Sequence, residues 1–188
     1  TKVILYTSNK EAQHSYCEKA KAEGYDVILL ESPIAGHSIQ KHETSQEKIR
    51  FARVDSDLLD KLIPKGDDRT SILTDSEKDK LKETIEKTLD DKKYSIRMEA
   101  LGSDDVPMLI TIPEFMRRMK EMSATGGGGF MGMGDFPETY DLVINVNHPL
   151  SAKILKAKGA KKDEIINHAK DLALLKQNLL QGEALTTF

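Results

Sequence analysis

The sequence predicts a small α/β unit with a parallel sheet, followed by an α+β domain that ends in long helices. Three observations carry this prediction. Apolar strand-like runs alternate with polar helical segments over residues 1–63, which is typical of a parallel sheet covered by helices. Residues 64–76 are rich in turn formers and read as a linker. Beyond them, strand-like runs give way to helical segments. We expect the first unit to have three layers, α/β/α, and the boundary to lie near residue 70.

Three short strands are expected in the first unit. They are "VILYTS" at 3–8, "YDVILLE" at 25–31 and "IRFARVD" at 49–55. A polar helical segment, 10–22, connects the first two runs, and Gly24 is placed to end it as a C′ glycine. Asp55 ends the third run, and Asp57 and Asp60 follow it. They predict a turn and the start of a short helix rather than a cation site.

A helix and three more strands are expected at the start of the second domain. Thr74 and Glu77 have the spacing of a capping box, which predicts a helix from there to about Asp91. "KYSIRMEAL" at 93–101 and "VPMLITI" at 106–112 are expected to pair with each other, and "YDLVINV" at 140–146 is a further strand. Asn147 is placed to cap a short helix that Gly159 ends.

The last long helix, expected over 161–181, has an apolar face too wide for a helix resting on one neighbour. One stripe comprises Ile165, Ala169, Leu172, Leu175 and Leu179, and an adjacent stripe comprises Ile166, Ala173 and Leu180. Two interpretations remain open. The helix is buried in the centre of its own domain, or it packs in a bundle with another subunit, which we favour.

The stretch "TIPEFMRRMKEMSATGGGGFMGMGDF", 111–136, holds five of the seven methionines and six of the twelve glycines. On a helix that starts at Pro113, one apolar stripe comprises Phe115, Met116, Met119 and Met122. Methionine adapts to varied apolar partners, and a glycine tether has little stiffness. The stripe is therefore either ordinary core or an adaptable contact surface. Phe130, Met131 and Met133 lie within the glycine-rich part.

Composition and motifs exclude several classes of function. With 31% charged residues and a formal net charge of −3, the chain of 188 residues has no general attraction to nucleic acid or to anionic membranes. The histidines lack metal-ligand spacing, and no catalytic constellation is present. The lone Cys17 suits a reducing cytoplasm. One alternative function is a Cu(I) carrier that uses the thioethers of Met116, Met119, Met122, Met131 and Met133.

Several segments together resemble a known family. They are "EAQHSYCEKAKAEGYDVILLES", "FARVDSD", "YSIRMEALGSDDVPMLITIPEFMRRMKEM", "DLVINVNHPL" and "AKDLALLKQNLLQGEAL". In this order, and over nearly the whole chain, they look like the bacterial HtpG branch of the heat-shock protein 90 chaperones. The chain starts without Met on a strand and ends just after a helix, so we read it as a piece of a longer protein.

The resemblance implies a domain assignment. Residues 1–70 would be the C-terminal part of the middle domain. Residues 71–188 would be the C-terminal dimerisation domain, with its last helix truncated at "LTTF". The family binds ATP and Mg in an N-terminal domain that this chain does not contain. The chain itself is therefore expected to hold no cofactor and to be no enzyme, whereas its full-length parent would be an ATPase.

The resemblance also implies partners and sites in a cytoplasmic chaperone. Unfolded client proteins would bind Phe115, Met116, Met119 and Met122, together with Phe130, Met131 and Met133. His37 aligns with a client-facing position that is aromatic in some relatives. A homodimer would form through Ile165, Ala169, Leu172, Leu175 and Leu179. Neither nucleic acid nor a membrane is an expected partner.

Overall fold

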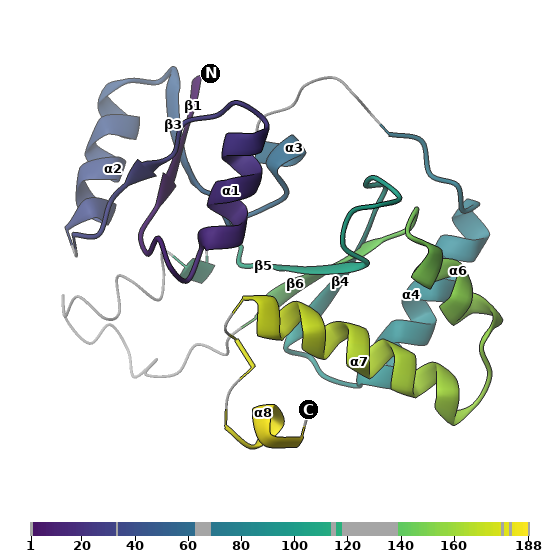
Figure 1. Cartoon of the computed structure of the whole chain (residues 1–188). Helices are drawn as coiled ribbons and strands as arrows, with labels where there is room; N and C mark the ends of the chain where they lie inside the picture. The colour runs from purple at the N-terminus through teal and green to yellow at the C-terminus, as the bar shows by residue number, and fades with distance from the viewer. Residues whose placement is uncertain are drawn as a thin grey trace. The chain divides into compact units, whose positions relative to one another are not determined.

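The chain forms two structural units, each with its own three-stranded sheet (Figure 1). The computed structural model describes residues 2–32, 34–62, 69–113, 116–117, 139–177, 179–180 and 182–187. One unit groups Thr1–Lys65 with Ile112–Glu138, and the other groups Gly66–Thr111 with Thr139–Phe188. The elements of the first unit are β1 (Lys2–Thr7), α1 (His14–Ala22), β2 (Ile28–Leu29), α2 (Ala35–Ser45), β3 (Ile49–Arg53) and α3 (Leu59–Leu62).

The first sheet is parallel, in the order β2-β1-β3. Successive side chains of a strand point to opposite faces of the sheet, so they contact helices on different sides. Leu5 packs into a buried cluster with Cys17 of α1 and with side chains of α3. The Phe51 ring, which is on the other face, lies 6.5 Å from the His42 ring of α2. Helices thus cover both faces, and the predicted three-layer α/β unit is confirmed.

The second unit contains a mixed sheet in the order β4-β6-β5. Its strands are β4 (Tyr94–Glu99), β5 (Met108–Thr111) and β6 (Tyr140–Asn145). β6 is parallel to β4 and antiparallel to β5. The predicted direct pairing of β4 with β5 is therefore wrong. β6 lies between them and is buried on both of its faces: Leu142 and Val143, on opposite faces, are both fully buried.

The helices of the second unit are α4 (Asp75–Leu89), α6 (Pro149–Lys156), α7 (Ala160–Lys176) and α8 (Glu183–Thr187). The predicted capping box opens α4. Thr74 accepts from the Glu77 amide, and the Glu77 carboxylate accepts from the Thr74 amide. α4 packs against β4 and α7 against β5. No helix in the described ranges is long and apolar enough to cross a membrane.

Three predicted helix ends differ from the structure. His148, not Asn147, caps α6, because its Nδ1 accepts a hydrogen bond from the Leu150 amide at 3.0 Å. Gly159 stands at the start of α7 with φ of 56° rather than at the end of α6. α7 stops at Lys176, short of the predicted residue 181, and the amides of Gln177 and Leu179 both bond to the carbonyl of Leu174.

Candidate interaction surfaces

One side of α7 forms part of the core of the second unit. Ile166 is completely buried, and Ala169, Ala173 and Leu174 are nearly so. The three-residue stripe expected from the sequence comprises Ile166, Ala173 and Leu180. Leu180 is also buried, beyond the end of the helix. This stripe therefore packs within its own unit.

The other side of α7 leaves large apolar side chains in contact with solvent. Leu172 is 48% exposed and Leu175 is 38% exposed, while Ile165 is half-buried. Leu179, which follows the end of the helix, is also half-buried. Ala169, which was expected on the same stripe, is only 5% exposed. The five-residue stripe expected from the sequence therefore has two exposed leucines and two partly exposed residues.

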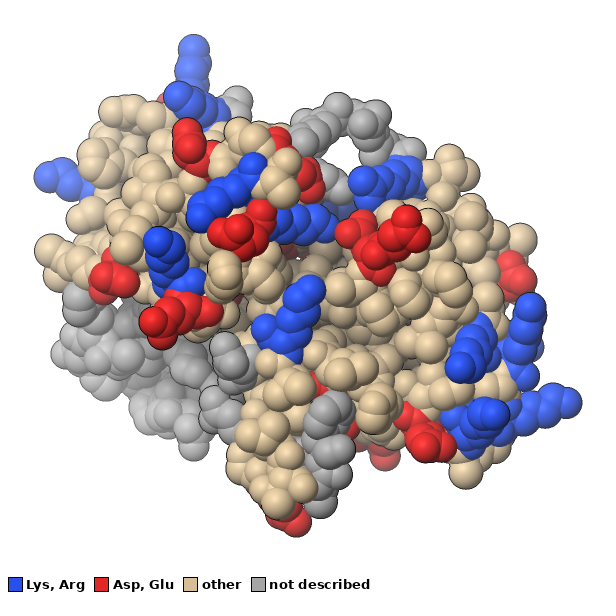
Figure 2. All heavy atoms as spheres, in the orientation of Figure 1, with Lys and Arg blue, Asp and Glu red and all other residues tan. Residues whose placement is uncertain are grey.

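Polar contacts hold α7 in place at its N-terminal end. Asp163, in the first turn, accepts a hydrogen bond from the Thr88 hydroxyl of α4 at 2.9 Å. A negative charge at this position also interacts favourably with the helix dipole. Figure 2 shows Lys and Arg side chains gathered towards this end of α7, whereas mainly uncharged residues cover the middle of the helix. The exposed leucines thus lie on a helix whose N-terminal end is held in place.

His37 lies on the exposed surface of α2 in the first unit. It lines a hollow of about 440 Å³. The other described lining residues are Gln40, Lys41, Thr44 and Ser45. Their spacing along the helix places them on the same side as His37. This side of α2 is polar, so His37 is accessible but has no apolar neighbours among these residues.

The methionine-rich segment is described only at its start. Met116 is half-buried. The other predicted client-binding residues of this segment, Phe115, Met119, Met122, Phe130, Met131 and Met133, lie outside the described residues. All of the Cu(I) ligands in the alternative interpretation except Met116 also lie outside the described residues.

The start of this segment belongs to the first unit, which the sequence analysis did not foresee. The Ile112 amide donates to the carbonyl of Asp55 at 3.1 Å. Arg117 is only 6% exposed, and its guanidinium carbon lies 5.5 Å from the centre of the Tyr6 ring, a cation–π distance. Nothing in the sequence around Arg117 distinguishes a buried arginine from one that is exposed to solvent.

A buried polar cluster supports the same corner of the first unit. The Arg53 guanidinium binds the Asp55 carboxylate through two hydrogen bonds, of 2.6 and 3.0 Å, and the Gln13 amide adds a third at 3.3 Å. Burial, with Asp55 nearby as the second cause, raises the pKa of the Tyr16 phenol above its ordinary value. This paired arrangement fixes Asp55. In the described part of the chain, no group of three or more His, Cys, Asp or Glu side chains is placed to hold a metal.

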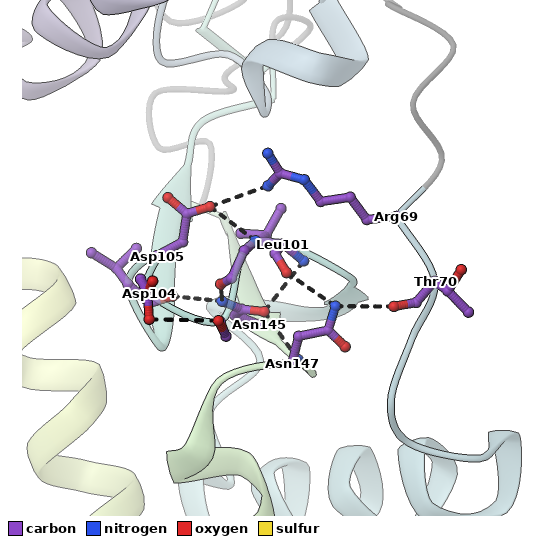
Figure 3. A network of polar contacts seen from close by, with 10 residues as sticks. Arg69, Thr70, Leu101, Asp104, Asp105, Asn145 and Asn147 are labelled. Atoms are coloured by element: carbon purple, nitrogen blue, oxygen red, sulfur yellow. Dashed lines mark hydrogen bonds and ion pairs between the residues drawn. The ribbon is translucent and has the colours of Figure 1, made fainter.

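The segment "NVNHPL", which contributes to the family resemblance, forms a polar network at the end of β6 (Figure 3). Asn145 is fully buried, and its Oδ1 accepts from the amides of Leu101 at 3.3 Å and Asn147 at 3.0 Å. Its Nδ2 donates to the carbonyls of Gly102 at 2.8 Å and Val106 at 3.4 Å. Asn145 therefore closes the loop between β4 and β5.

Known proteins with similar sequences are chaperones. The chain is 36% identical over 156 residues to the chaperone protein HtpG of Bacteroides fragilis (strain 638R), a match that covers 81% of this chain and 23% of the relative. The corresponding protein of Porphyromonas gingivalis (strain ATCC 33277) is 38% identical over the same shares. That of Bacteroides thetaiotaomicron is 35% identical over 161 residues, with shares of 84% and 24%.

These matches confirm the resemblance predicted from the sequence, although no family model matches the chain. The chain spans about a quarter of the length of the curated relatives that it matches. The chain therefore belongs to the heat-shock protein 90 chaperones of the HtpG branch, over the segment that these relatives share with it.

Proposed function

We propose that this chain is a client-binding and dimerising part of an ATP-dependent chaperone. The relatives are chaperone proteins, which supports a chaperone activity for this chain. Residues 1–70 would end the middle domain and residues 71–188 would form the C-terminal dimerisation domain. ATP and Mg would bind a part of the parent protein outside this segment, so that the chain by itself hydrolyses no ATP.

The observation that carries the dimerisation proposal is the exposed side of α7. Burying a leucine fully is worth about 1.5–3 kcal/mol. With 48% and 38% of their surface exposed, Leu172 and Leu175 together forgo roughly 2 kcal/mol per protomer. A second copy that meets the same surface about a two-fold axis recovers this amount on both protomers. Ile165 and Leu179, which are half-buried, extend the proposed contact, and Ala169 supports it from beneath.

Sedimentation equilibrium tests the dimer. Leu172→Glu/Leu175→Glu should raise the dissociation constant of the dimer at least about a hundredfold, because roughly 4 kcal/mol of burial is lost. Ile34→Glu is the matched control, since Ile34 is 66% exposed and lies in the first unit. A wild-type chain that stays monomeric at millimolar concentration, or a double variant that dimerises normally, would contradict the proposal.

We place client binding on Phe115, Met116, Met119 and Met122, with Phe130, Met131 and Met133 beyond them, and on the accessible His37. The hydrogen bond from Ile112 to Asp55 and the buried Arg117 support this proposal, because they fix the start of the segment while Met116 keeps part of its surface. The proposed client-binding side chains would therefore follow a point of the chain that is attached to the first unit.

Fluorescence anisotropy with a labelled, permanently unfolded model protein tests client binding. Phe115→Ser/Met119→Ser should weaken affinity at least tenfold, because two large apolar contacts of about 1.5–3 kcal/mol each are removed. Leu185→Ser, a change at a leucine of α8 that is 48% exposed, is the control and should bind normally. Equal affinity of the double variant and the wild type would remove the client-binding assignment.

A further inference from the structure

Five lysines lie close together where α6 ends and α7 begins, and we refer to them as the lysine patch. Lys153 and Lys156 belong to the last turn of α6, Lys158 lies between the helices, and Lys161 and Lys162 belong to the first turn of α7. Four of these side chains are exposed, and that of Lys162 is half-buried. Figure 2 shows basic side chains gathered around this end of α7. The patch therefore presents several ammonium groups to solvent in one region of the second unit.

The lysine patch is strongly basic in a chain that is acidic overall. Residues 153–162 contain five lysines and no Asp or Glu, so their local charge is +5. Because the whole chain has a formal net charge of −3, the rest of the chain carries −8. Positive charge concentrated in this way creates a local potential that attracts negatively charged partners.

Carboxylates of the chain do not neutralise the lysine patch. Elsewhere in the second unit a lysine pairs with an acidic residue one helical turn away, as Lys78 does with Asp75 at 2.8 Å. None of the five lysines of the patch forms such an ion pair in the described part of the chain. Glu164 follows Lys161 by three residues, yet these two side chains are not paired. The charge of the patch thus remains available to a partner.

Two of the lysines also oppose the electrostatic preference of their own helix. Lys161 and Lys162 lie at the N-terminal end of α7, where the helix dipole favours negative charge. Asp163, the acidic residue of this turn, accepts a hydrogen bond from Thr88 of α4. A bound anion would offset the repulsion among the lysines and would interact favourably with the dipole. Such departures from local stability preferences are expected at functional sites.

The backbone beneath the lysine patch is held firmly. Ile154 of α6 is 1% exposed and Ile166 of α7 is fully buried, so both helices are anchored in the core of the second unit. Gly159 connects them with φ of 56°, a conformation that other residues rarely adopt. The lysines therefore extend from fixed positions, and only their flexible side chains have to adapt to a partner.

The composition of the lysine patch favours carboxylates over nucleic acid as its ligand. All five residues are lysines, which act as flexible point charges, whereas arginine is better suited to phosphate because it binds two oxygens at once. Residues 149–164 contain no Phe, Tyr or Trp on which bases could stack. A long polyanion would also extend beyond the patch and meet a chain that carries −8 elsewhere. A short acidic segment contacts the patch alone.

We propose that the lysine patch binds an extended acidic segment, rich in Asp and Glu, of a partner protein. This surface is separate from the apolar side chains proposed for dimerisation, because Lys161 and Leu172 are roughly 16 Å apart along α7. It is also separate from the proposed client-binding residues, which are apolar or lie in the first unit. The interaction with the acidic segment therefore goes beyond the proposed function and can be tested independently of it.

Fluorescence anisotropy with a labelled peptide of alternating Glu and Ser tests the lysine patch in the whole chain. Lys156→Gln/Lys158→Gln/Lys161→Gln should weaken binding of this peptide about tenfold, because three exposed ion pairs are lost and a tenfold change corresponds to about 1.4 kcal/mol. Replacing the same three lysines with Arg keeps the charge and should preserve binding. The affinity of the wild type should fall steeply towards 1 M salt, where charges are screened within about 3 Å.

The matched control removes the same amount of charge from another part of the surface. Lys2→Gln/Lys10→Gln/Lys48→Gln changes three exposed lysines of the first unit and should bind the acidic peptide as the wild type does. Equal weakening in both triple variants would mean that the net charge of the chain, and not the patch, attracts the peptide, and the proposal would be wrong.

Two further results would also overturn the proposal. One is a wild-type chain that binds the acidic peptide no better than a peptide of alternating Gln and Ser. The other is a labelled single-stranded DNA of thymidines that binds the wild type more tightly than the acidic peptide and loses this affinity in Lys156→Gln/Lys158→Gln/Lys161→Gln. The patch would then be a nucleic-acid surface.

Discussion

Asn145 should be the most sensitive polar residue of the second unit. Replacing it with Ala removes a hydrogen bond from four backbone groups at once, namely the amides of Leu101 and Asn147 and the carbonyls of Gly102 and Val106. The Gly102 carbonyl keeps a second bond, from the Asp105 amide at 3.1 Å. Asn145 is fully buried and Leu101 is 5% exposed, so water cannot readily replace these bonds.

The magnitude follows from the number of groups left without partners. A buried polar group without a hydrogen bond costs about 1–3 kcal/mol. The Leu101 amide is well shielded, the other groups are partly buried, and the deleted side chain leaves a small void, so we expect a loss of about 3–5 kcal/mol in the free energy of unfolding. Asn147→Ala should cost only about 1 kcal/mol, because two of the three partners of its side chain, the Thr70 carbonyl and the Ile72 amide, belong to exposed residues and only the Leu101 carbonyl does not.

Urea denaturation tests this expectation. Hydrogen exchange of the β6 amides serves as the probe, so that the unfolding of the second unit is measured. With a slope of about 2 kcal/mol per molar, the urea midpoint should fall by roughly 2 M for Asn145→Ala and by roughly 0.5 M for Asn147→Ala. A loss below about 1 kcal/mol for Asn145→Ala, or one no larger than that of Asn147→Ala, would refute the reasoning from burial.

Two further predictions concern a helix cap and an ionisable group. Thr74→Ala removes one half of the capping box of α4 and should lower the free energy of unfolding by about 1 kcal/mol, measured by the same urea method, whereas Thr74→Ser should be close to wild type. Burial raises the pKa of Tyr16 in the folded chain, so the phenol stays protonated where the unfolded chain has already lost its proton. The stability of the first unit should therefore fall as pH rises above about 10, and this fall should be smaller in Tyr16→Phe. An unchanged alkaline slope in Tyr16→Phe would contradict this assignment.

Features set by local chemistry were predicted well from the sequence. The capping box of α4 depends on residues three apart, and the parallel sheet of the first unit depends on short apolar runs separated by a helix. In each case the interaction that decides the structure lies within a few residues, or follows from connection length.

Features set by distant partners were not predicted. The pairing of β4 and β5 with the intervening β6 depends on which strand is apolar on both faces, a comparison across the whole unit. Asn147 has the composition of a helix cap, yet its partners Thr70 and Ile72 are more than seventy residues away in sequence. The residues of the α7 stripe were recognised, but their division between core and surface depends on what the rest of the fold covers.

The short length of β2 has a consequence for solubility. β2 forms an edge of the first sheet and carries two exposed apolar side chains, Ile28 at 45% and Leu29 at 47%. An exposed edge with such side chains can recruit strands of other chains and start aggregation. Here the strand has only two residues, so an incoming strand would find very few backbone groups to pair with. The short length of β2, rather than charge, therefore limits pairing at this edge. Substitutions that lengthen β2 would allow other chains to pair with its backbone.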